Sequence, residues 1–418
     1  MFFNGQASHP FAGAVGLTAS SNRSPGADNA KTRELDGEHI GMIASNRRHM
    51  SQMLDDLMSR SRAQVRAGAT KDKTHVKTYL VEASLPENTK PAQAHDFVES
   101  LLPLVKADQI SDLSLSPATN DTLISVQAKV SGEPITAYVD FTNPRFWFVH
   151  SMGDSKKTDW LIARWVGELP ELDHAWFPTS FLENCEQFGS IRGVGLDYNR
   201  TWLNKDDTDD TRVGALTMQV RGQASKRILG VMRRQNAAPN ETPLAKVTVR
   251  LNGGRGLDDV RYDGKLVGRG KSFEDHLSLA SNLYGRYQSQ VRLVESDYAI
   301  GPEKSGRCLT IQGEPITFTF DRPIQDMTLF SEGMFAGTEP FKLWGVPVRH
   351  AEDYYTVQAF DLHSARPLAF ELSPKAIRLY LPKGSCGNSV LRFYANLQHR
   401  YDAMVQAVNG SGDPVFAF

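Results

Sequence analysis

The chain has 418 residues, of which 40% are hydrophobic and 23% are charged, an ordinary composition for a folded protein. This length allows two or three domains with a sizeable core. The sequence contains no apolar run of about 18 residues, and residues 1–30 lack the basic start and apolar run of a signal peptide. We therefore expect no membrane contact and a cytoplasmic location.

Cysteine usage points to a reducing compartment. Cys185, Cys308 and Cys386 are odd in number and far apart in the sequence. This pattern argues against a disulfide framework, and no two cysteines have the spacing of zinc ligands. We accordingly expect no metal site and no cofactor, apart from Mg²⁺ if the chain is a nuclease.

The net charge of −1 hides a strong asymmetry along the chain. Residues 212–271 hold 13 lysines and arginines but only four acidic residues, a net charge of +9 that leaves −10 for the rest of the chain. This asymmetry is the largest compositional signal in the sequence.

The N-terminal part predicts a disordered tail and then one helix. Residues 1–34 carry too little periodic apolar surface to offset the entropy of ordering. Residues 35–68 have the periodicity of an amphipathic helix that begins near Asp36 and ends near Gly68. Its polar side is rich in arginine, so this basic helix packs either on its own domain or on a partner. We expect a protein partner or self-association through it.

The remaining chain predicts α+β structure, with mostly antiparallel sheets and separated helices. We expect an α+β domain over 69–190, a basic α+β region over 191–305 and a β-rich domain over 306–418 that closes with a helix from about 388 to 408. Strands are also expected at 290–294 and 327–330. The pentapeptide Gly-Glu-Pro-Ile-Thr occurs twice, from Gly132 and from Gly313, and a repeated turn-plus-strand explains it more simply than two related lobes.

The basic segment predicts contacts with the phosphates of nucleic acid. Clustered lysine and arginine neutralise phosphates and release counterions, which gives affinity without sequence specificity. Aromatic residues for base stacking are sparse here, with only Tyr262 and Phe273 nearby. The candidate contacts are Arg221, Lys226, Arg227, Arg233, Arg234, Arg255, Arg261, Lys265, Arg269 and Lys271. The alternative is a solvated face, or one that pairs with acidic surface of this chain or a partner.

A glycine-rich stretch inside this segment does not have the spacing of a phosphate loop. In the run from Gly264 to Ser272, Lys265 occupies the position where that motif requires glycine. We therefore do not expect nucleotide hydrolysis from this stretch.

The C-terminal part offers candidates for a nuclease or another hydrolase. Arg392 and His399 lie seven residues apart on the expected last helix, a spacing that resembles the Arg-x4–6-His pattern of HEPN ribonucleases. The resemblance covers eight residues and implies metal-independent RNA cleavage with His399 as acid or base. HEPN domains are helical bundles, whereas strands are expected before this helix, so we favour a helix with a core-facing side.

Two further candidates lie close to that helix. In a metal-dependent nuclease of the restriction-enzyme type, the carboxylates of Asp361 and Glu371 would hold Mg²⁺ and Lys375 would help to activate water. His363 would be a further ligand or base, although a β-hairpin with polar turns explains these residues more simply. Cys386 begins the last helix, where a helix N-terminus lowers a thiol pKa. A glycine-rich capping turn is the simpler interpretation of that stretch.

These observations lead to three hypotheses in order of preference. The first is a nucleic-acid-binding component of a multi-protein assembly, for DNA or RNA, that contacts phosphates with little sequence specificity. The second is a nuclease or hydrolase with its site in the C-terminal domain. The third is a scaffold subunit whose basic and acidic surfaces pair in an oligomer. No motif places the chain in a known family.

Overall fold

The computed structural model describes residues 42–68, 75–105, 108–119, 121–200, 214–234, 239–253, 256–270, 272–305 and 308–418. Residues 40–418 form one compact unit. The predicted tail, together with Arg255 and Lys271 of the basic segment, lies outside the described residues. Among the described helices, none is long and apolar enough to cross a membrane.

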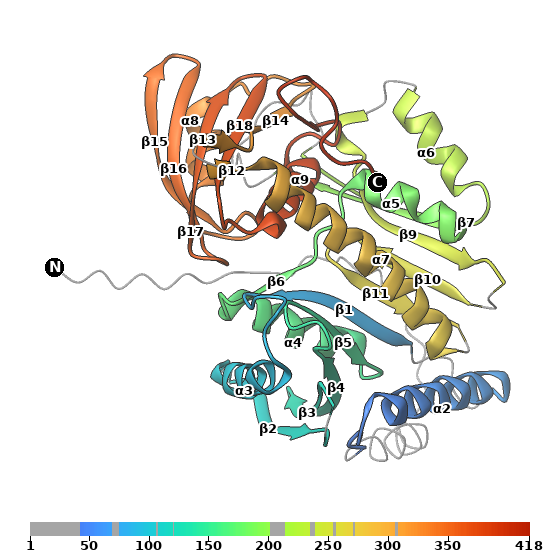
Figure 1. Ribbon diagram of the computed structural model, residues 1–418. Coiled ribbons are helices and arrows are strands. Elements are labelled where there is room, and N and C mark those ends of the chain that lie inside the picture. The colour runs from blue at the N-terminus through green and yellow to red at the C-terminus, as the bar shows by residue number, and fades with distance from the viewer. Residues whose placement is uncertain are drawn as a thin grey trace. The chain divides into compact units, whose positions relative to one another are not determined.

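The larger of two sheets takes its strands from the first two thirds of the chain. They are β1 (Val76–Ala83), β2 (Ile110–Pro117), β3 (Leu123–Val130), β4 (Glu133–Asp140), β5 (Phe146–Ser151), β6 (Leu172–His174), β7 (Gly189–Asn199), β8 (Ala215–Arg221), β9 (Leu244–Leu251), β10 (Leu257–Arg261) and β11 (Lys265–Gly268). Their order is β2-β3-β4-β5-β1-β11-β10-β9-β7-β8, and β6 also pairs with β1. Strands from both sides of the expected boundary at residue 190 therefore belong to one sheet (Figure 1).

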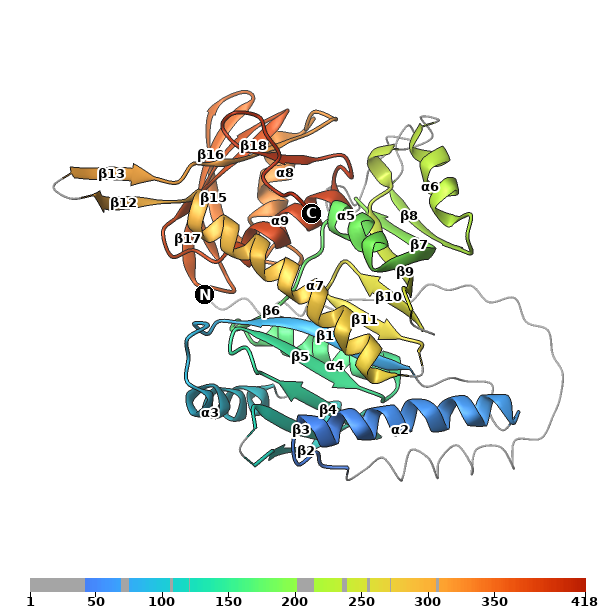
Figure 2. The same ribbon diagram turned by 45° about the vertical axis from the view of Figure 1, so that its right-hand side comes forward.

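Helices cover this sheet on both faces. They are α2 (Arg47–Arg66), α3 (Pro91–Leu101), α4 (Ser155–Glu168), α5 (Thr179–Glu183), α6 (Ser225–Arg234) and α7 (Phe273–Leu293), with short turns at Leu102–Leu104, Asn184–Phe188, Pro239–Glu241 and Val294–Tyr298. Alternate residues of a strand point to opposite faces. Tyr79 and Val81 accordingly pack with α3 and α4, whereas Val76 packs with α2 and the start of α7. The methionines and leucines of α2 are buried against this chain's own sheet (Figure 2).

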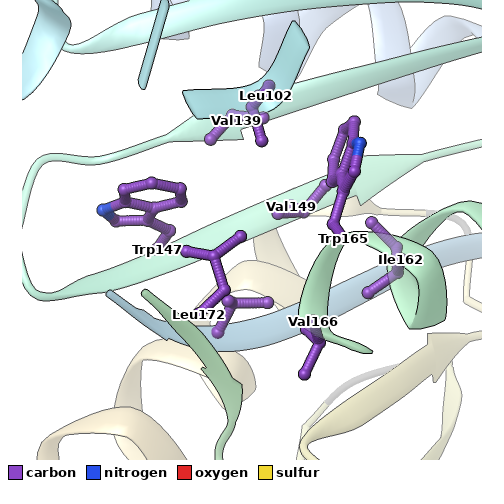
Figure 3. A pocket seen from close by; sticks show the side chains of 9 residues that line it. Leu102, Val139, Trp147, Val149, Ile162, Trp165, Val166 and Leu172 are labelled. Carbon is purple, nitrogen blue, oxygen red and sulfur yellow. The ribbon is translucent and has the colours of Figure 1, made fainter. Parts of the chain in front are cut away.

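A cavity of about 10 Å³ lies between α4 and the sheet. Figure 3 shows Trp147, Trp165 and Leu172 around it, and all its lining residues are apolar. A cavity of this size holds about one water, which requires polar partners. This space is therefore a packing gap in the core and not a ligand site.

The smaller sheet is built from the last third of the chain. Its strands are β12 (Ala299–Ser305), β13 (Cys308–Gln312), β14 (Ile316–Thr319), β15 (Leu343–Ala351), β16 (Tyr354–Asp361), β17 (Arg366–Ser373), β18 (Ala376–Pro382) and β19 (Gln406–Val408). The order is β13-β12-β18-β17-β16-β15, with β14 between β18 and β19. Only the β12–β18 pair is parallel among the described strand pairs, so the predicted α+β fold with mostly antiparallel sheets is confirmed.

Two helices accompany the smaller sheet, α8 (Met327–Met334) and α9 (Gly387–Arg400). Helix α9 is buried along residues 387–399 and packs against α7, β7 and the smaller sheet (Figure 1). Phe393 contacts Phe318 and Phe370 of that sheet. A continuous core therefore joins both sheets through α9.

Several expected elements differ from those in the structure. The strand expected at 290–294 is the last turn of α7, which continues into a π-helical turn at Val294–Tyr298. The strand expected at 327–330 is helix α8, and the closing helix ends at Arg400 and not near residue 408. The sequence also predicts a helical stretch over 157–188 that is interrupted at Pro170 and Pro178, and the structure has α4, β6, α5 and a 3-10 turn there.

Candidate functional site

Charged and polar side chains gather where the start of α9 meets the ends of strands from both sheets. We call this set the polar cluster, and its members are Glu82, Arg145, Asp173, Tyr287, Glu295, Asp361, His363, Cys386, Asn388 and Arg392. Gly387 allows the close approach, because a Cβ atom there would lie 2.4 Å from the carbonyl oxygen of Val291 in α7. The first turn of α9 can reach these groups only with glycine at this position.

The inner half of the polar cluster is centred on Arg392. This side chain is fully buried and forms ion pairs with Asp173 and Asp361, and its Nε donates to the Phe341 carbonyl oxygen at 2.9 Å. Burial alone would raise the pKa of the Asp361 carboxyl, but the Arg392 guanidinium holds that pKa below its ordinary value. The inner half is therefore a compensated ionic network in the core.

Both carboxylates of this network are saturated with hydrogen bonds. Asp361 accepts from the hydroxyl groups of Ser364 and Ser389, each at 2.6 Å. Asn388 donates to Asp173 at 3.0 Å and itself accepts a hydrogen bond from the Tyr287 hydroxyl. Buried charges are tolerated only when they are paired and hydrogen-bonded in this way.

The outer half of the polar cluster contains a carboxylate, an imidazole and a thiol. Glu82 Oε2 lies 3.3 Å from His363 Nε2, and both Glu82 oxygens lie 3.3 Å from the Cys386 Sγ. Arg145 pairs with Glu82 on one side at 2.6 Å and with Glu295 on the other at 2.6 Å. Cys386 is partly exposed, whereas Glu82 and His363 are buried, so solvent reaches this half from the cysteine side.

The protonation state of each of these groups depends on the neighbouring groups as well as on burial. Burial would lower the pKa of His363, but hydrogen bonds to Cys386 and Glu82 raise it well above its ordinary value. Burial and the Glu82 carboxylate raise the pKa of the Cys386 thiol. The Nδ1 of His363 lies 2.9 Å from the Pro170 carbonyl oxygen, and this nitrogen must carry the proton because a carbonyl only accepts.

A second charged region lies on the larger sheet, on the face of β7–β10 that points away from α9. One row of opposed residues crosses β8, β7, β9 and β10, and its members therefore share a face of the sheet. In that order of strands they are Gln219, Gly195, Lys246 and Arg261. Arg221 lies in the next row, and Arg250 lies four residues beyond Lys246 on the same strand face. We call Arg221, Lys246, Arg250 and Arg261 the basic face.

The charges of the basic face act on one another. Burial lowers the pKa of Lys246, Asp259 opposes this shift, and Arg269, Arg221 and Arg261 lower the pKa further. The opposing Asp259 pairs with Arg269 and lies 3.7 Å from Lys246. Three arginines and one carboxylate therefore act on the pKa of Lys246, and one of these arginines, Arg261, itself pairs with Asp263 at 3.2 Å.

Comparison with known proteins places the chain in a family. Residues 41–415 match the model of a family described as MJECL33-like protein. The chain belongs to the MJECL33-like family. A relative from Methanocaldococcus jannaschii, named Uncharacterized protein MJECL33, is 25% identical over 393 residues, which cover 78% of this chain and 95% of the relative. The matched range contains the polar cluster and the basic face, and the family description states no activity.

The four catalytic candidates from the sequence fall into three places. Asp361 and Arg392 meet inside the polar cluster. Glu371 lies on β17 and pairs with Arg378 at 2.9 Å, outside the cluster. His399 stacks on Tyr262 with ring centroids 3.9 Å apart, and its Nδ1 lies 2.6 Å from the Asp197 carbonyl oxygen. Arg392 and His399 thus share a helix but contact different groups.

The nucleic-acid candidates divide into paired and exposed side chains. Lys226 pairs with Glu186, and Arg233 pairs with Glu183, at the two ends of α6. Lys265 is buried and pairs with Asp159 of α4 at 2.5 Å. Arg261 pairs with Asp263 at 3.2 Å, and Arg269 pairs with Asp259. The exposed candidates among the described residues are Arg221, Lys226, Arg227 and Arg234. The basic segment is therefore not one continuous surface.

Sequence reasoning did not identify Glu82, Arg145, Asp173 and Glu295 as site residues. Glu82 stands in a strand whose eight residues are all buried, and a carboxylate at such a position requires a partner. That signal was readable in the apolar run around Glu82. Arg145 could not be predicted as the partner of Glu82, because it lies far from Glu82 in the sequence, in a turn.

Proposed function

We propose that the chain binds the phosphate backbone of a nucleic acid through the basic face. The observation that carries this proposal is the row of opposed residues on β8, β7, β9 and β10, in which Lys246 and Arg261 are neighbours and Gly195 has no side chain. Lysine and arginine on one flat surface match the repeating charge of a nucleic-acid backbone.

The aromatic residues near the basic face support phosphate contact over base stacking. Tyr262 stacks on His399 with ring centroids 3.9 Å apart, and it contacts Trp176 in a tilted arrangement with centroids 5.9 Å apart. Phe273 is fully buried against α2. Neither ring is free to stack on a base, so affinity would come from charge, with little sequence preference.

Helix α2 adds exposed arginines near the end of β11, although it packs on the other face of the sheet from the basic face. Arg62 Nη2 donates to the carbonyl oxygen of Arg269 at 3.0 Å, which fixes the C-terminal half of α2 beside β11. Arg60 and Arg66 on the same helix are exposed. Because the apolar side of α2 is buried in its own chain, the arginine side is the part of this helix that remains for a ligand.

The alternative of a Mg²⁺-dependent nuclease at Asp361 has less support from the geometry. The Asp361 carboxylate already accepts from Arg392, Ser364 and Ser389. A carboxylate has about four acceptor positions, so little capacity remains for a metal. Glu371, the second carboxylate of that alternative, pairs elsewhere with Arg378.

The test is fluorescence anisotropy with labelled single-stranded and duplex oligonucleotides over a series of salt concentrations. About four phosphate contacts predict roughly a hundred-fold weaker binding when the salt concentration rises fourfold. The variant Arg221→Glu/Arg250→Glu should reduce the slope of log affinity against log salt by about 1.8 for duplex DNA.

Two matched variants locate the contact. Arg164→Glu/Arg349→Glu reverses two charges outside the basic face, on α4 and β15, and should leave affinity within about twofold. Arg227→Glu/Arg234→Glu tests α6 in the same way. Equal affinity and equal salt slope for the basic-face variant and the Arg164/Arg349 variant would overturn the proposal.

A further inference from the structure

Three donor atoms of different chemistry converge in the outer half of the polar cluster. The carboxylate of Glu82, Nε2 of His363 and Sγ of Cys386 all lie within 4.8 Å of one another. Glu82 is 3.3 Å from each of the other two. Ligands held about 2.0–2.3 Å from one tetrahedral ion lie roughly 3.3–3.8 Å apart, so the two separations from Glu82 match edges of such a site.

The surroundings orient each donor as they do in metal sites. His363 donates from Nδ1 to the Pro170 carbonyl oxygen at 2.9 Å, which directs Nε2 toward Glu82 and Cys386. Such a hydrogen bond from the second ring nitrogen is the usual support of a metal-binding histidine. Arg145 Nε donates to Oε1 of Glu82 at 2.7 Å and so leaves Oε2 directed at the imidazole.

The guanidinium of Arg145 lies close to two of the three donors, because its Nη2 is 3.5 Å from the Cys386 Sγ and its Nε donates to Glu82. Glu295 pairs with it through two hydrogen bonds, at 2.6 and 3.0 Å, and compensates its charge. Glu295 also accepts from the backbone N–H of Gly387 at 2.8 Å, which fixes the loop that carries Cys386. With Arg145 and Glu295 balanced, the Glu82 carboxylate and a Cys386 thiolate supply two negative charges for a divalent ion.

We propose that Glu82, His363 and Cys386 bind one divalent transition-metal ion of the Zn²⁺ class. A set with sulfur, nitrogen and oxygen donors selects Zn²⁺ and similar ions over Mg²⁺ or Ca²⁺, which prefer oxygen alone. Three protein ligands would leave the fourth position of a tetrahedral ion open to water or a substrate, and Cys386 is the partly exposed residue of the three. This site differs from the sequence-based expectation of no metal, because its ligands are 281 and 23 positions apart and show no ligand spacing. It does not depend on the nucleic-acid proposal.

The first test is titration of chelator-treated, full-length protein with Co²⁺. We expect one Co²⁺ per chain, with a thiolate-to-metal charge-transfer band in the near ultraviolet that Zn²⁺ abolishes by displacement. Cys386→Ser should lose the band and bind at least about tenfold more weakly. Cys308→Ser, which changes the exposed cysteine of β13, is the matched control and should behave as the wild type.

The second test requires no variant and therefore does not depend on a variant's folding. Iodoacetamide labelling is followed by peptide mass analysis, with and without Zn²⁺. Zn²⁺ should slow alkylation of Cys386 at least about tenfold and leave the labelling of Cys308 unchanged. Equal labelling rates of Cys386 in both conditions, or the same Co²⁺ band in Cys386→Ser and Cys308→Ser, would overturn the proposal.

Discussion

The polar cluster and the basic face use charge in opposite ways. In the polar cluster Arg392 lies between two carboxylates, and Arg145 likewise lies between two. On the basic face Lys246 has three arginines and one carboxylate acting on its pKa. The inner half of the polar cluster compensates its charges internally, whereas the proposed role of the basic face is to offer positive charge to a ligand.

The two regions also differ in how their residues are distributed along the chain. The polar cluster takes its members from β1, the turn before β5, β6, α7, the π-helical turn, the end of β16 and the turn after it, and α9 with its N-cap residue. The basic face comes from β8, β9 and β10, which lie within one stretch of sequence. The local composition of the chain therefore reveals the basic face, but it cannot reveal the polar cluster.

The largest effect should come from removing the central cation of the polar cluster. Arg392→Met leaves the carboxylates of Asp173 and Asp361 buried without their partner, and we expect a loss of about 3–5 kcal/mol in the free energy of unfolding. Urea denaturation measures it. Arg378→Met, which breaks an exposed pair with Glu371, is the control and should cost less than about 1 kcal/mol.

The triple variant Asp173→Asn/Asp361→Asn/Arg392→Met separates charge from packing. It removes both carboxylates together with the guanidinium, so it should recover part of the lost stability. If Arg392→Met alone cost no more than Arg378→Met, the inner network would contribute nothing to folding.

The mixed α+β fold was predictable because strand and helix periodicities are local. The boundaries of some helices and strands could not be predicted, because packing against residues far away in the sequence determines them. Val291 and Val294 favour a strand by propensity, yet both are fully buried in the continuation of α7 and its π-helical turn. In α8 a readable signal was missed: the Asp326 side chain accepts from the N–H of Leu329 at 2.9 Å and caps the helix.

The repeated pentapeptide shows what a local motif can predict. Gly132 and Gly313 both have positive φ angles, +80° and +83°. Each precedes a strand, β4 in the larger sheet and β14 in the smaller one. The identical pentapeptide therefore begins with a left-handed glycine turn at both places, as the turn-plus-strand interpretation expects.

A smaller part of the candidate site, four of the ten members of the polar cluster with His363 included, was predictable in the same sense. Asp361, Cys386 and Arg392 were each recognisable as reactive types in a short C-terminal stretch, and the structure brings them into one cluster. Their partners Glu82 and Asp173 come from the other sheet. Without the long-range pairing of β1 and β6, the sequence offered no reason to place them together.

The second largest loss of stability should come from a substitution at the close contact between α9 and α7 that brings α9 to the polar cluster. Gly387→Ala would place a methyl group 2.4 Å from a backbone oxygen, so we expect a loss of about 1–3 kcal/mol, measured by urea denaturation. Gly285→Ala in the exposed middle of α7 meets nothing within 4 Å and should instead stabilise the protein by about 0.5–1 kcal/mol. Equal effects at the two positions would contradict the role given to Gly387.

A smaller effect should appear on acidification. Burial lowers the pKa of His150 to about 3 and that of His399 to about 4. Below pH ~6.5 the unfolded chain binds protons that the folded chain does not, so stability should fall between pH 6.5 and 4, by up to about 1.4 kcal/mol per pH unit for each histidine. Thermal unfolding in this range measures it, and His399→Asn should have a shallower slope. A slope unchanged by that substitution would mean that His399 titrates normally.

The smallest change in stability should come from a substitution on the basic face. Such a substitution distinguishes a role in ligand binding from a role in the stability of the sheet. Lys246→Met removes a charge that three arginines already disfavour, so the free energy of unfolding should stay within about 0.5 kcal/mol. The salt slope of oligonucleotide binding should nevertheless fall by about 0.9 for duplex DNA. Lys375→Met, at an exposed turn between β17 and β18, should change neither quantity. If Lys246→Met instead lost more than about 2 kcal/mol and kept its salt slope, Lys246 would serve the sheet and not a ligand, and the contrast between the two regions would disappear.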